Sequence, residues 1–281
     1  MAKEKSKTQG KAGARLLAFL VTMALVAALL PVADIPATAA ENGALLPQYC
    51  ETTEELKEKI AEYLSLRTAS FELTCPPELE REWGKSPLRL VDEAEKLCED
   101  SIRWGRGKTH VEWYTDDGKV TINYTVTYHT TNGKDAAARK YATELVKWLD
   151  IGNLSERGKV DVICEYVNEN LGYDSSKKSK TEYDTFVLRE GTCMGLSLST
   201  KMLLTEAGIE SKVITGGAYG VSTHMWLIAK IDGYWYVIDA TRLDSASHLA
   251  ASIDAGKYIA DAEFKTESFK EAHPVKSTAA A

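Results

Sequence analysis

Hydrophobic and polar positions along the N-terminal part of the chain follow first a helical and then a strand period. Residues 52–69 predict a helix with Thr53 as its N-cap. Its apolar side chains recur at helical spacing: Leu56, Ile60, Tyr63 and Leu64. Residues 70–75 (SFELTC) predict a short strand that ends at a Pro-Pro pair. Residues 86–102 predict a second helix with Pro87 in its first turn.

The middle of the chain changes from strand to helix. HVEWYTDDGKVTINYTVTYHT (110–130) contains two runs rich in Val, Thr, Tyr and Trp, and Asp117-Gly118 between them predicts a β-hairpin. Helical periodicity returns at 137–151 and again at 155–170. The N-terminal part therefore predicts a small α/β region ahead of a group of helices.

The C-terminal part predicts one more helix and a set of strands. The helix covers 192–207 and ends at Gly208, a usual C-terminal signal. Strands are expected at three places: 211–215, 223–231 and 234–241. Residues 216–222 (GGAYGVS) predict a flexible loop, interpreted as a flap beside the site described below. Asp232-Gly233 predicts a two-residue hairpin turn.

The first 40 residues have a different pattern. Five basic side chains precede an uncharged apolar run at 16–30, and a small-x-small sequence follows at Ala37-Thr38-Ala39. This order is typical of a secretory signal peptide cleaved after Ala39 or Ala40. The apolar run is about 15 residues, short of the roughly 20 that a spanning helix needs, so an uncleaved anchor is the weaker alternative. The sequence predicts a secreted or cell-surface protein without stable membrane insertion after signal removal.

Charge and composition exclude several partners. The chain has 281 residues, a net charge of −7 and a hydrophobic content of 44%. The leader carries five basic and two acidic side chains, a net +3, so the remainder has a charge near −10 (−7 minus 3). An acidic chain without basic clusters does not favour nucleic acid binding. No grouping of His, Cys, Asp and Glu has metal-ligand spacing, so we expect neither a metal nor another cofactor.

Five cysteines in an exported chain permit disulfides, and the odd number leaves at least one thiol free. Cys193 stands apart because it directly precedes an apolar helix. The other four can pair in three ways, or can all stay reduced as small hydrophobic residues: Cys50, Cys75, Cys98 and Cys164. The sequence leaves both alternatives open.

The Asp-Gly turn fixes a strand register that brings two polar residues together. With a two-residue loop, Ile231 pairs with Tyr234, and Trp226 then faces Asp239. His224 lies on the same side of its strand as Trp226, because side chains alternate with period two. His224 and Asp239 therefore share one sheet face as a diagonal pair, within reach of each other. The intervening indole would keep water from the imidazole.

Cys193 falls in the first turn of the predicted helix, with Thr192 as N-cap. The unpaired N–H groups and the helix dipole favour a thiolate at that position. The Cys193 N–H is also a candidate donor to an oxyanion. A thiolate, an imidazole such as His224 and an orienting carboxylate such as Asp239 are the groups needed for acyl transfer through a thioester. Whether the sheet face looks at the helix start is the condition for this site.

EGTCMGLSLSTKMLLTEAGIESKVITGG followed by HMWLIAKIDGYWYVIDAT resembles the transglutaminase-like superfamily. The resemblance covers roughly 160–245. The matching positions are Gly191, Cys193, Gly195, Gly208, Ile209, His224, Trp226, Asp232, Gly233, Trp235, Tyr236, Asp239 and Thr241. It implies an α+β fold with a papain-like, transglutaminase-like core. In that core a catalytic cysteine stands at a helix N-terminus packed on an antiparallel sheet, preceded by a small α/β N-terminal region.

The resemblance also implies roles for individual residues. Cys193 would be the nucleophile, His224 the general base and acid, and Asp239 the orienting carboxylate. Tyr173, in NLGYD, resembles an upstream aromatic position of the family and would lie on the oxyanion or substrate side of the site, as would Trp226. The chain departs from the family pattern at two positions. Met225 stands where the family often has a small residue, and Arg242 stands where it often has Trp. Both departures concern the substrate cleft.

These observations predict a bacterial exported cysteine enzyme that acts on peptide or isopeptide amide bonds of a protein or peptide substrate, for example one associated with the cell wall. Hydrolysis by a protease or amidase is favoured over a second reading, a protein-crosslinking transglutaminase. A third reading is a non-catalytic binding domain of the same fold at the cell surface. The expected organisation is a signal peptide, an N-terminal α/β region, a catalytic domain and a C-terminal tail: 1–40, 41–132, 133–270 and 271–281.

Overall fold

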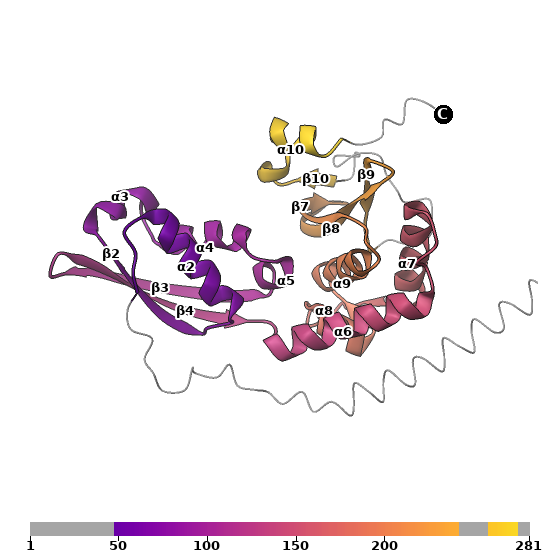
Figure 1. The fold of residues 1–281 in the computed structure, drawn as a ribbon, viewed down its shortest axis with the longest axis horizontal. Coiled ribbons are helices and arrows are strands. Elements are labelled where there is room, and N and C mark those ends of the chain that lie inside the picture. The colour runs from indigo at the N-terminus through magenta and orange to yellow at the C-terminus, as the bar shows by residue number, and fades with distance from the viewer. Residues whose placement is uncertain (1–47, 242–257, 275–281) are drawn as a thin grey trace, which may run out of the picture. The chain divides into compact units, whose positions relative to one another are not determined.

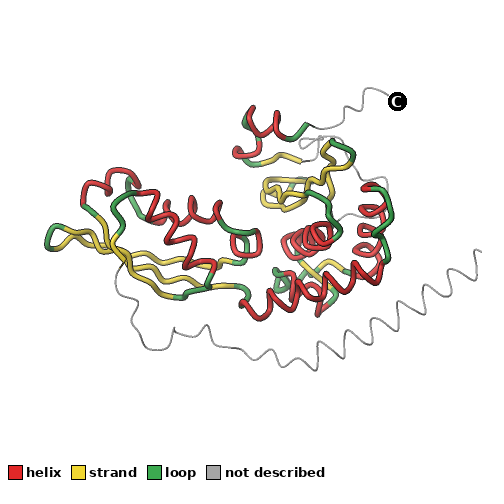
Figure 2. The backbone as a smooth tube through the Cα atoms, in the orientation of Figure 1, coloured by secondary structure: helices red, strands yellow, loops and turns green. Residues whose placement is uncertain are grey.

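The computed structural model describes residues 48–241 and 258–274, which form two four-stranded sheets, one two-stranded sheet and the helices packed on them (Figures 1 and 2). The predicted leader at 1–40 and Arg242 lie outside these residues. The mixed α+β class predicted from the sequence is confirmed. Within the described ranges, no helix is both long and apolar enough to cross a membrane.

The first sheet has the strand order β1-β2-β4-β3. Its strands are β1 (Gln48–Tyr49), β2 (Ser70–Cys75), β3 (Arg106–Asp116) and β4 (Lys119–Tyr128). Along β4 every second residue is buried, as the period of a half-buried strand requires: Val120, Ile122, Tyr124 and Val126. Helices α2 (Thr53–Ser65) and α4 (Leu88–Ala94) pack on this face and complete one hydrophobic core (Figure 1).

Two predictions about the first region need correction. The helix expected at 86–102 is not continuous, since α4 passes into a 3-10 turn, Cys98 is extended and α5 (Asp100–Arg103) forms a separate turn of helix. The N-cap of α2 is Thr52, whose hydroxyl accepts from the Glu55 N–H at 3.2 Å, and not the following threonine. The structure also contains η1 (Pro77–Leu79), α3 (Glu80–Trp83) and η2 (Glu95–Leu97). The hairpin predicted between β3 and β4 is confirmed.

The second sheet, antiparallel throughout, has the order β10-β7-β8-β9. Its strands are β7 (Ser211–Ala218), β8 (Val221–Ile231), β9 (Tyr234–Ile238) and β10 (Tyr258–Ala260). The helices of this region are α6 (Asn132–Leu149), α7 (Glu156–Asn170), α8 (Glu182–Leu188), α9 (Cys193–Glu206) and, after η3 (Ala262–Phe264), α10 (Glu267–Ala272). Helix α9 contacts β7 and β8 on one side and the helices α6, α7 and α8 on the other (Figure 1).

Helix α9 is buried on most of its circumference, as a helix enclosed by other elements must be. Its side chains are buried along successive positions and not along one stripe: Leu196, Ser197, Leu198, Ser199, Thr200, Leu203 and Leu204. The helix ends as the sequence predicted, with Gly208 at φ 77° just after it. The enclosure holds the first turn of α9 in a fixed place.

The prediction of a flexible loop at 216–222 is wrong. Strand β7 continues to Ala218 and β8 starts at Val221, so only Tyr219-Gly220 form the turn, at φ 52° and 84°. Two positive φ values make a tight hairpin turn that suits the twist of its strands. Three glycines in five residues suggested flexibility, yet this segment pairs as a hairpin with an irregularity between Gly216 and Ala218.

Candidate active site

Cys193 is the first residue of α9, and its side chain is half-buried. Thr192 caps this helix, with its hydroxyl oxygen accepting from the Gly195 N–H at 3.3 Å. Thr192 is itself held by the Ser179 carbonyl, which accepts from its N–H at 2.9 Å and from its hydroxyl at 3.2 Å. The predicted N-cap is therefore confirmed, and a second loop fixes it in place.

The two glycines beside the cysteine leave no room for a side chain. A Cβ at Gly191 would stand 2.6 Å from Thr185 Oγ1, and one at Gly195 would collide with the same hydroxyl and with the Ser179 carbonyl. Real Cβ atoms do not approach so closely. The Gly-x-Cys-x-Gly pattern is thus required by the packing of α8 and the 174–179 loop against the start of α9.

Asp174 organises that loop. Its carboxylate accepts from the N–H and hydroxyl of Ser176 at 2.7 and 2.6 Å, and from the N–H groups of Lys178 and Ser179 at 2.8 Å each. These hydrogen bonds, that from the Ser176 hydroxyl first, hold the pKa of Asp174 well below its usual range. Sequence reasoning missed this residue. An Asp followed by two serines is a signal for such a turn.

His224 lies on β8 and contacts Asp239, the first residue after β9. The observed register pairs Ile231 with Tyr234 and ends at Leu227 and Ile238. The predicted register is therefore confirmed, and the predicted diagonal pair is hydrogen bonded. His224 Nε2 lies 2.9 Å from Asp239 Oδ2.

Two neighbours hold this pair in place. Asp239 Oδ1 accepts from the N–H and hydroxyl of Thr241 at 3.0 and 2.8 Å, so the carboxylate has a fixed orientation. The buried Trp226 ring stacks on the imidazole, with ring centroids 6.1 Å apart. His224 and Asp239 are both buried.

The sheet face that carries His224 and Asp239 looks at the start of α9. Cys193 is hydrogen bonded to His224, and its sulfur also lies near the backbone N–H groups of Met225 and Met194. Four residues into α9, the Ser197 hydroxyl donates to the Met225 carbonyl at 3.1 Å and ties the helix to β8 beside the imidazole. A continuous chain of contacts thus joins thiol, imidazole and carboxylate.

The ionisation of the three groups is coupled. Burial alone would raise the pKa of Cys193, but the hydrogen bond and charge of His224 and the two backbone N–H groups lower it below its ordinary value. Burial lowers the pKa of His224, and the stronger effects of Asp239 and Cys193 raise it to about 9. Burial raises the pKa of Asp239, but the opposing effects of His224 and Thr241 are larger. The net result is a lowered pKa of Asp239. The two shifts have opposite signs, so each favours the charged form of its group: the thiolate of Cys193 and the imidazolium of His224.

Tyr173 stands close to the cysteine but makes no direct link to it. It lies in β5 (Gly172–Tyr173), which pairs with β6 (Glu190–Gly191) so that Tyr173 lies opposite Gly191. Its side chain is 55% exposed, and burial of the hydroxyl and the charge of Cys193 raise its pKa. Its role on the oxyanion or substrate side stays a prediction.

The other four cysteines differ from Cys193 in their surroundings. All five are free thiols in the structure. Burial raises the pKa of Cys75 and Cys164 to about 12 and also raises the pKa of Cys50 and Cys98. In the part of the chain that the structure describes, no cluster of three or more His, Cys, Asp or Glu side chains could hold a metal ion.

Fold and site together define a papain-like α+β domain with a thiol–imidazole–carboxylate arrangement at a helix start. Residues 139–240 match the family model of the transglutaminase-like superfamily. This match agrees with the resemblance that the motifs in this part of the chain predicted.

The chain is also similar to several solved structures. A TGase is 14% identical over 83% of this chain and 64% of its own, with a TM-score of 0.38. The periplasmic domain of TgpA from Pseudomonas aeruginosa is 15% identical over 48% of this chain and 63% of its own, with a TM-score of 0.31. The chain therefore spans less than two thirds of either structure. No curated protein matches it.

Proposed function

We propose that this protein is an exported cysteine enzyme that cleaves or transfers acyl groups at peptide or isopeptide amide bonds through a thioester. The observation that carries the proposal is the chain of hydrogen bonds from Cys193 through His224 to Asp239 at the start of α9. The export signal predicted at 1–40 supports an extracellular or cell-surface location.

In the proposed reaction, the Cys193 sulfur attacks the carbonyl carbon of the scissile amide, and the carbonyl oxygen becomes an oxyanion. The Cys193 N–H has no acceptor within its helix because it lies in the first turn, so it is the natural donor to that oxyanion. The protonated His224 gives its proton to the leaving amine as the carbon–nitrogen bond breaks. The products of this half are a free amine and a thioester on Cys193.

The second half of the reaction breaks the thioester and frees Cys193. His224, now neutral, takes a proton from the attacking water or amine, which adds to the thioester carbonyl. Cys193 leaves as a thiolate, and His224 retains the proton. Asp239 holds the ring orientation and stabilises the imidazolium in both halves. Water as acceptor gives hydrolysis, which we favour, and an amine gives transamidation.

Alkylation of the cysteine tests the ion pair without knowledge of the substrate. The rate of iodoacetamide labelling of Cys193 should stay high below the ordinary thiol pKa, because the thiolate persists there. In His224→Ala the rate at neutral pH should fall by about tenfold and follow a simple thiol titration. Equal rates and equal pH dependence in both proteins would contradict the proposal, and so would a Cys193 that reacts no faster than a free thiol.

A second experiment separates the two acceptors. The protein is incubated with a glutaminyl peptide and a labelled amine, with Cys193→Ser as the control that lacks the nucleophile. Release of acid or of peptide fragments without incorporated label supports hydrolysis. Incorporation of the label that depends on Cys193 would show that the crosslinking alternative is right.

A further inference from the structure

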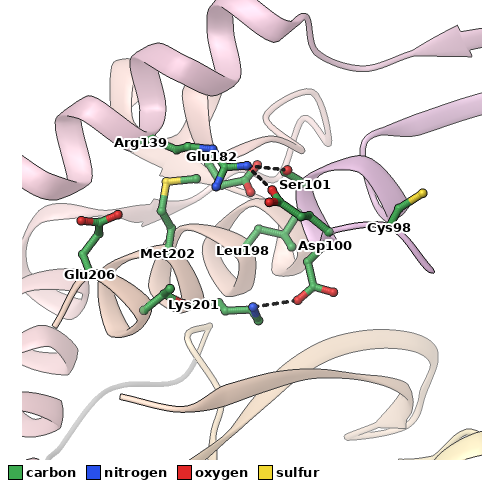
Figure 3. Close-up of a pocket in the computed structure, with 11 residues that line it drawn as sticks. Cys98, Asp100, Ser101, Arg139, Glu182, Leu198, Lys201, Met202 and Glu206 are labelled. Carbon is green, nitrogen blue, oxygen red and sulfur yellow. Dashed lines mark hydrogen bonds and ion pairs between the residues drawn. The ribbon is translucent and has the colours of Figure 1, made fainter. Parts of the chain in front are cut away.

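A cavity of about 390 Å³ lies against the second half of α9, on the part of the helix away from Cys193 (Figure 3). We call it the α9 cavity. Two apolar side chains of the helix, Leu198 and Met202, line it together with charged groups from three other segments. The charged side chains are Glu99, Asp100, Arg139, Glu182, Lys201 and Glu206.

The two cations of the α9 cavity are already paired. Lys201 Nζ lies 2.9 Å from Asp100 Oδ2, and Arg139 forms an ion pair with Glu99. Figure 3 shows the contact between Lys201 and Asp100 as a dashed line. Four carboxylates and two cations line the cavity, so two carboxylates remain without a cation among the lining residues.

These two carboxylates differ in their surroundings. Glu206 accepts a hydrogen bond from the Thr143 hydroxyl at 2.9 Å. Glu182 is only 5% exposed and, in the described part of the chain, has neither an ion pair nor a hydrogen bond to another residue. Among these residues, the Glu182 carboxylate accepts a hydrogen bond only from its own backbone N–H. A buried carboxylate without a partner is costly unless it is neutralised or meets a cation.

The groups around Glu182 do not compensate its charge. Burial is the main cause that raises the pKa of Glu182 to about 7, and the negative charge of Asp135 on α6 adds to it. Arg139 on α6 and Arg67 act in the opposite direction, but both donate to other carboxylates. Lys201 of α9 is paired with Asp100, as described above. Near neutral pH the cavity therefore holds a carboxylate that alternates between a proton and a negative charge.

We propose that the α9 cavity binds a small aliphatic ammonium ion, with Glu182 as its counter-ion and Leu198 and Met202 against its alkyl chain. An anion is disfavoured by the excess of carboxylates. A metal ion is disfavoured because the described residues contain no cluster of three ligands, and the apolar side chains suit an alkyl group instead.

The α9 cavity is separate from the proposed acyl-transfer site. Lys201 and Glu206 lie eight and thirteen residues after Cys193 on one helix, which corresponds to about 12 and 20 Å along its axis. An ammonium ion bound there is therefore not the amine acceptor of the proposed reaction. The inference stands even if the proposed function fails.

Binding of n-butylamine, which is protonated at the pH values used, tests the proposal on the full mature chain by calorimetry and thermal unfolding. We expect saturable binding and a raised Tm at about pH 8, and about tenfold weaker binding at pH 6, because only the ionised fraction of Glu182 is competent. n-Butanol, which has the same alkyl chain without the charge, should not bind. No binding of n-butylamine, or equal binding of n-butanol, would overturn the proposal.

Two variants identify the counter-ion. Glu182→Gln keeps the side-chain shape and should abolish binding; it should also fold, since removal of an unpaired buried charge raises the Tm of the unliganded protein. Glu144→Gln removes an exposed carboxylate from α6 and should bind n-butylamine as the unmodified protein does. Retained binding in Glu182→Gln, or equal loss in both variants, would show that Glu182 is not the counter-ion and would overturn the inference.

Discussion

At the scale of single residues, the charge of His224 depends on one carboxylate. Asp239→Asn keeps the size of the side chain and its contacts with Thr241 but removes the negative charge that helps to raise the pKa of His224 to about 9. The pKa of His224 should therefore fall, and the alkaline limit of activity should move to lower pH. We also expect kcat to fall by about 10²- to 10⁴-fold.

The pH profile of kcat/KM measures this change, and the Tm of the variant shows whether the fold is intact. A structural role for Asp239 would lower activity without moving the alkaline limit. Such an unshifted limit would contradict the assigned role.

The five thiols provide a second prediction at this scale. Under native conditions near neutral pH, an alkylating reagent followed by peptide mapping should label Cys193 first. Cys75 and Cys164 should stay unlabelled until the protein unfolds, because burial raises their pKa to about 12. After unfolding, all five should react. Loss of two thiols in protein isolated from an oxidising compartment would instead reveal a disulfide between cysteines that the structure shows as free.

At the scale of secondary-structure elements, the position of the nucleophile is set by what encloses the start of α9. Gly195→Ala inserts a methyl group against the Thr185 hydroxyl and the Ser179 carbonyl, so α8 or the 174–179 loop must shift. We expect a loss of about 1–3 kcal/mol in unfolding free energy and a slower alkylation of Cys193. Gly152→Ala is the matched control, because no atom lies within 4 Å of its added Cβ. Equal stability of the two variants would show that the close packing at Gly195 is not important.

The same elements show what the sequence could predict. The Asp-Gly turn set the β8–β9 register and placed His224 next to Asp239, because a two-residue hairpin loop leaves only one in-register pairing. The Thr192 cap followed from a strong local preference at helix starts. Both depend on residues that are near in sequence, so local rules suffice.

The missed elements depend on contacts that are distant in sequence. Residues 86–102 contain enough helix-forming side chains for one helix, but Cys98 is extended in the structure. Helix α8 spans seven residues, too short to give a clear period. The role of Asp174 appears only when the 174–179 loop meets Thr192 in space, which local rules do not describe.

At the scale of the whole molecule, a buried ion pair connects residues that follow α2 with the start of α6. Arg67 and Asp135 form this pair, and their side chains are only 3% and 11% exposed. Arg67 also donates to the Ser101 carbonyl at 3.0 Å, and Asp135 accepts from the Thr130 hydroxyl at 2.8 Å. Nothing in the sequence pattern predicts that these two charges meet, since 68 residues separate them.

Removal of one charge of this pair should lower the unfolding free energy far more than removal of both charges. Asp135→Asn leaves the Arg67 guanidinium buried without its counter-charge, and we expect a loss of about 3–5 kcal/mol in unfolding free energy. The double variant Arg67→Met/Asp135→Leu replaces the charges with apolar groups and should recover most of that loss. Urea denaturation of the single and double variants measures both losses in unfolding free energy.

An exposed ion pair provides the control. Arg157 and Asp161 on α7 form a pair whose side chains are 43% and 40% exposed, and Asp161→Asn should cost no more than about 0.5 kcal/mol. If Asp135→Asn costs as little as Asp161→Asn, the buried pair does not hold α6 to the N-terminal region. If it costs several kcal/mol and the double variant recovers them, the position of α6 depends on a charge pair between segments that no local pattern connects. Helix α9 packs against α6, so the same variant should also slow the alkylation of Cys193.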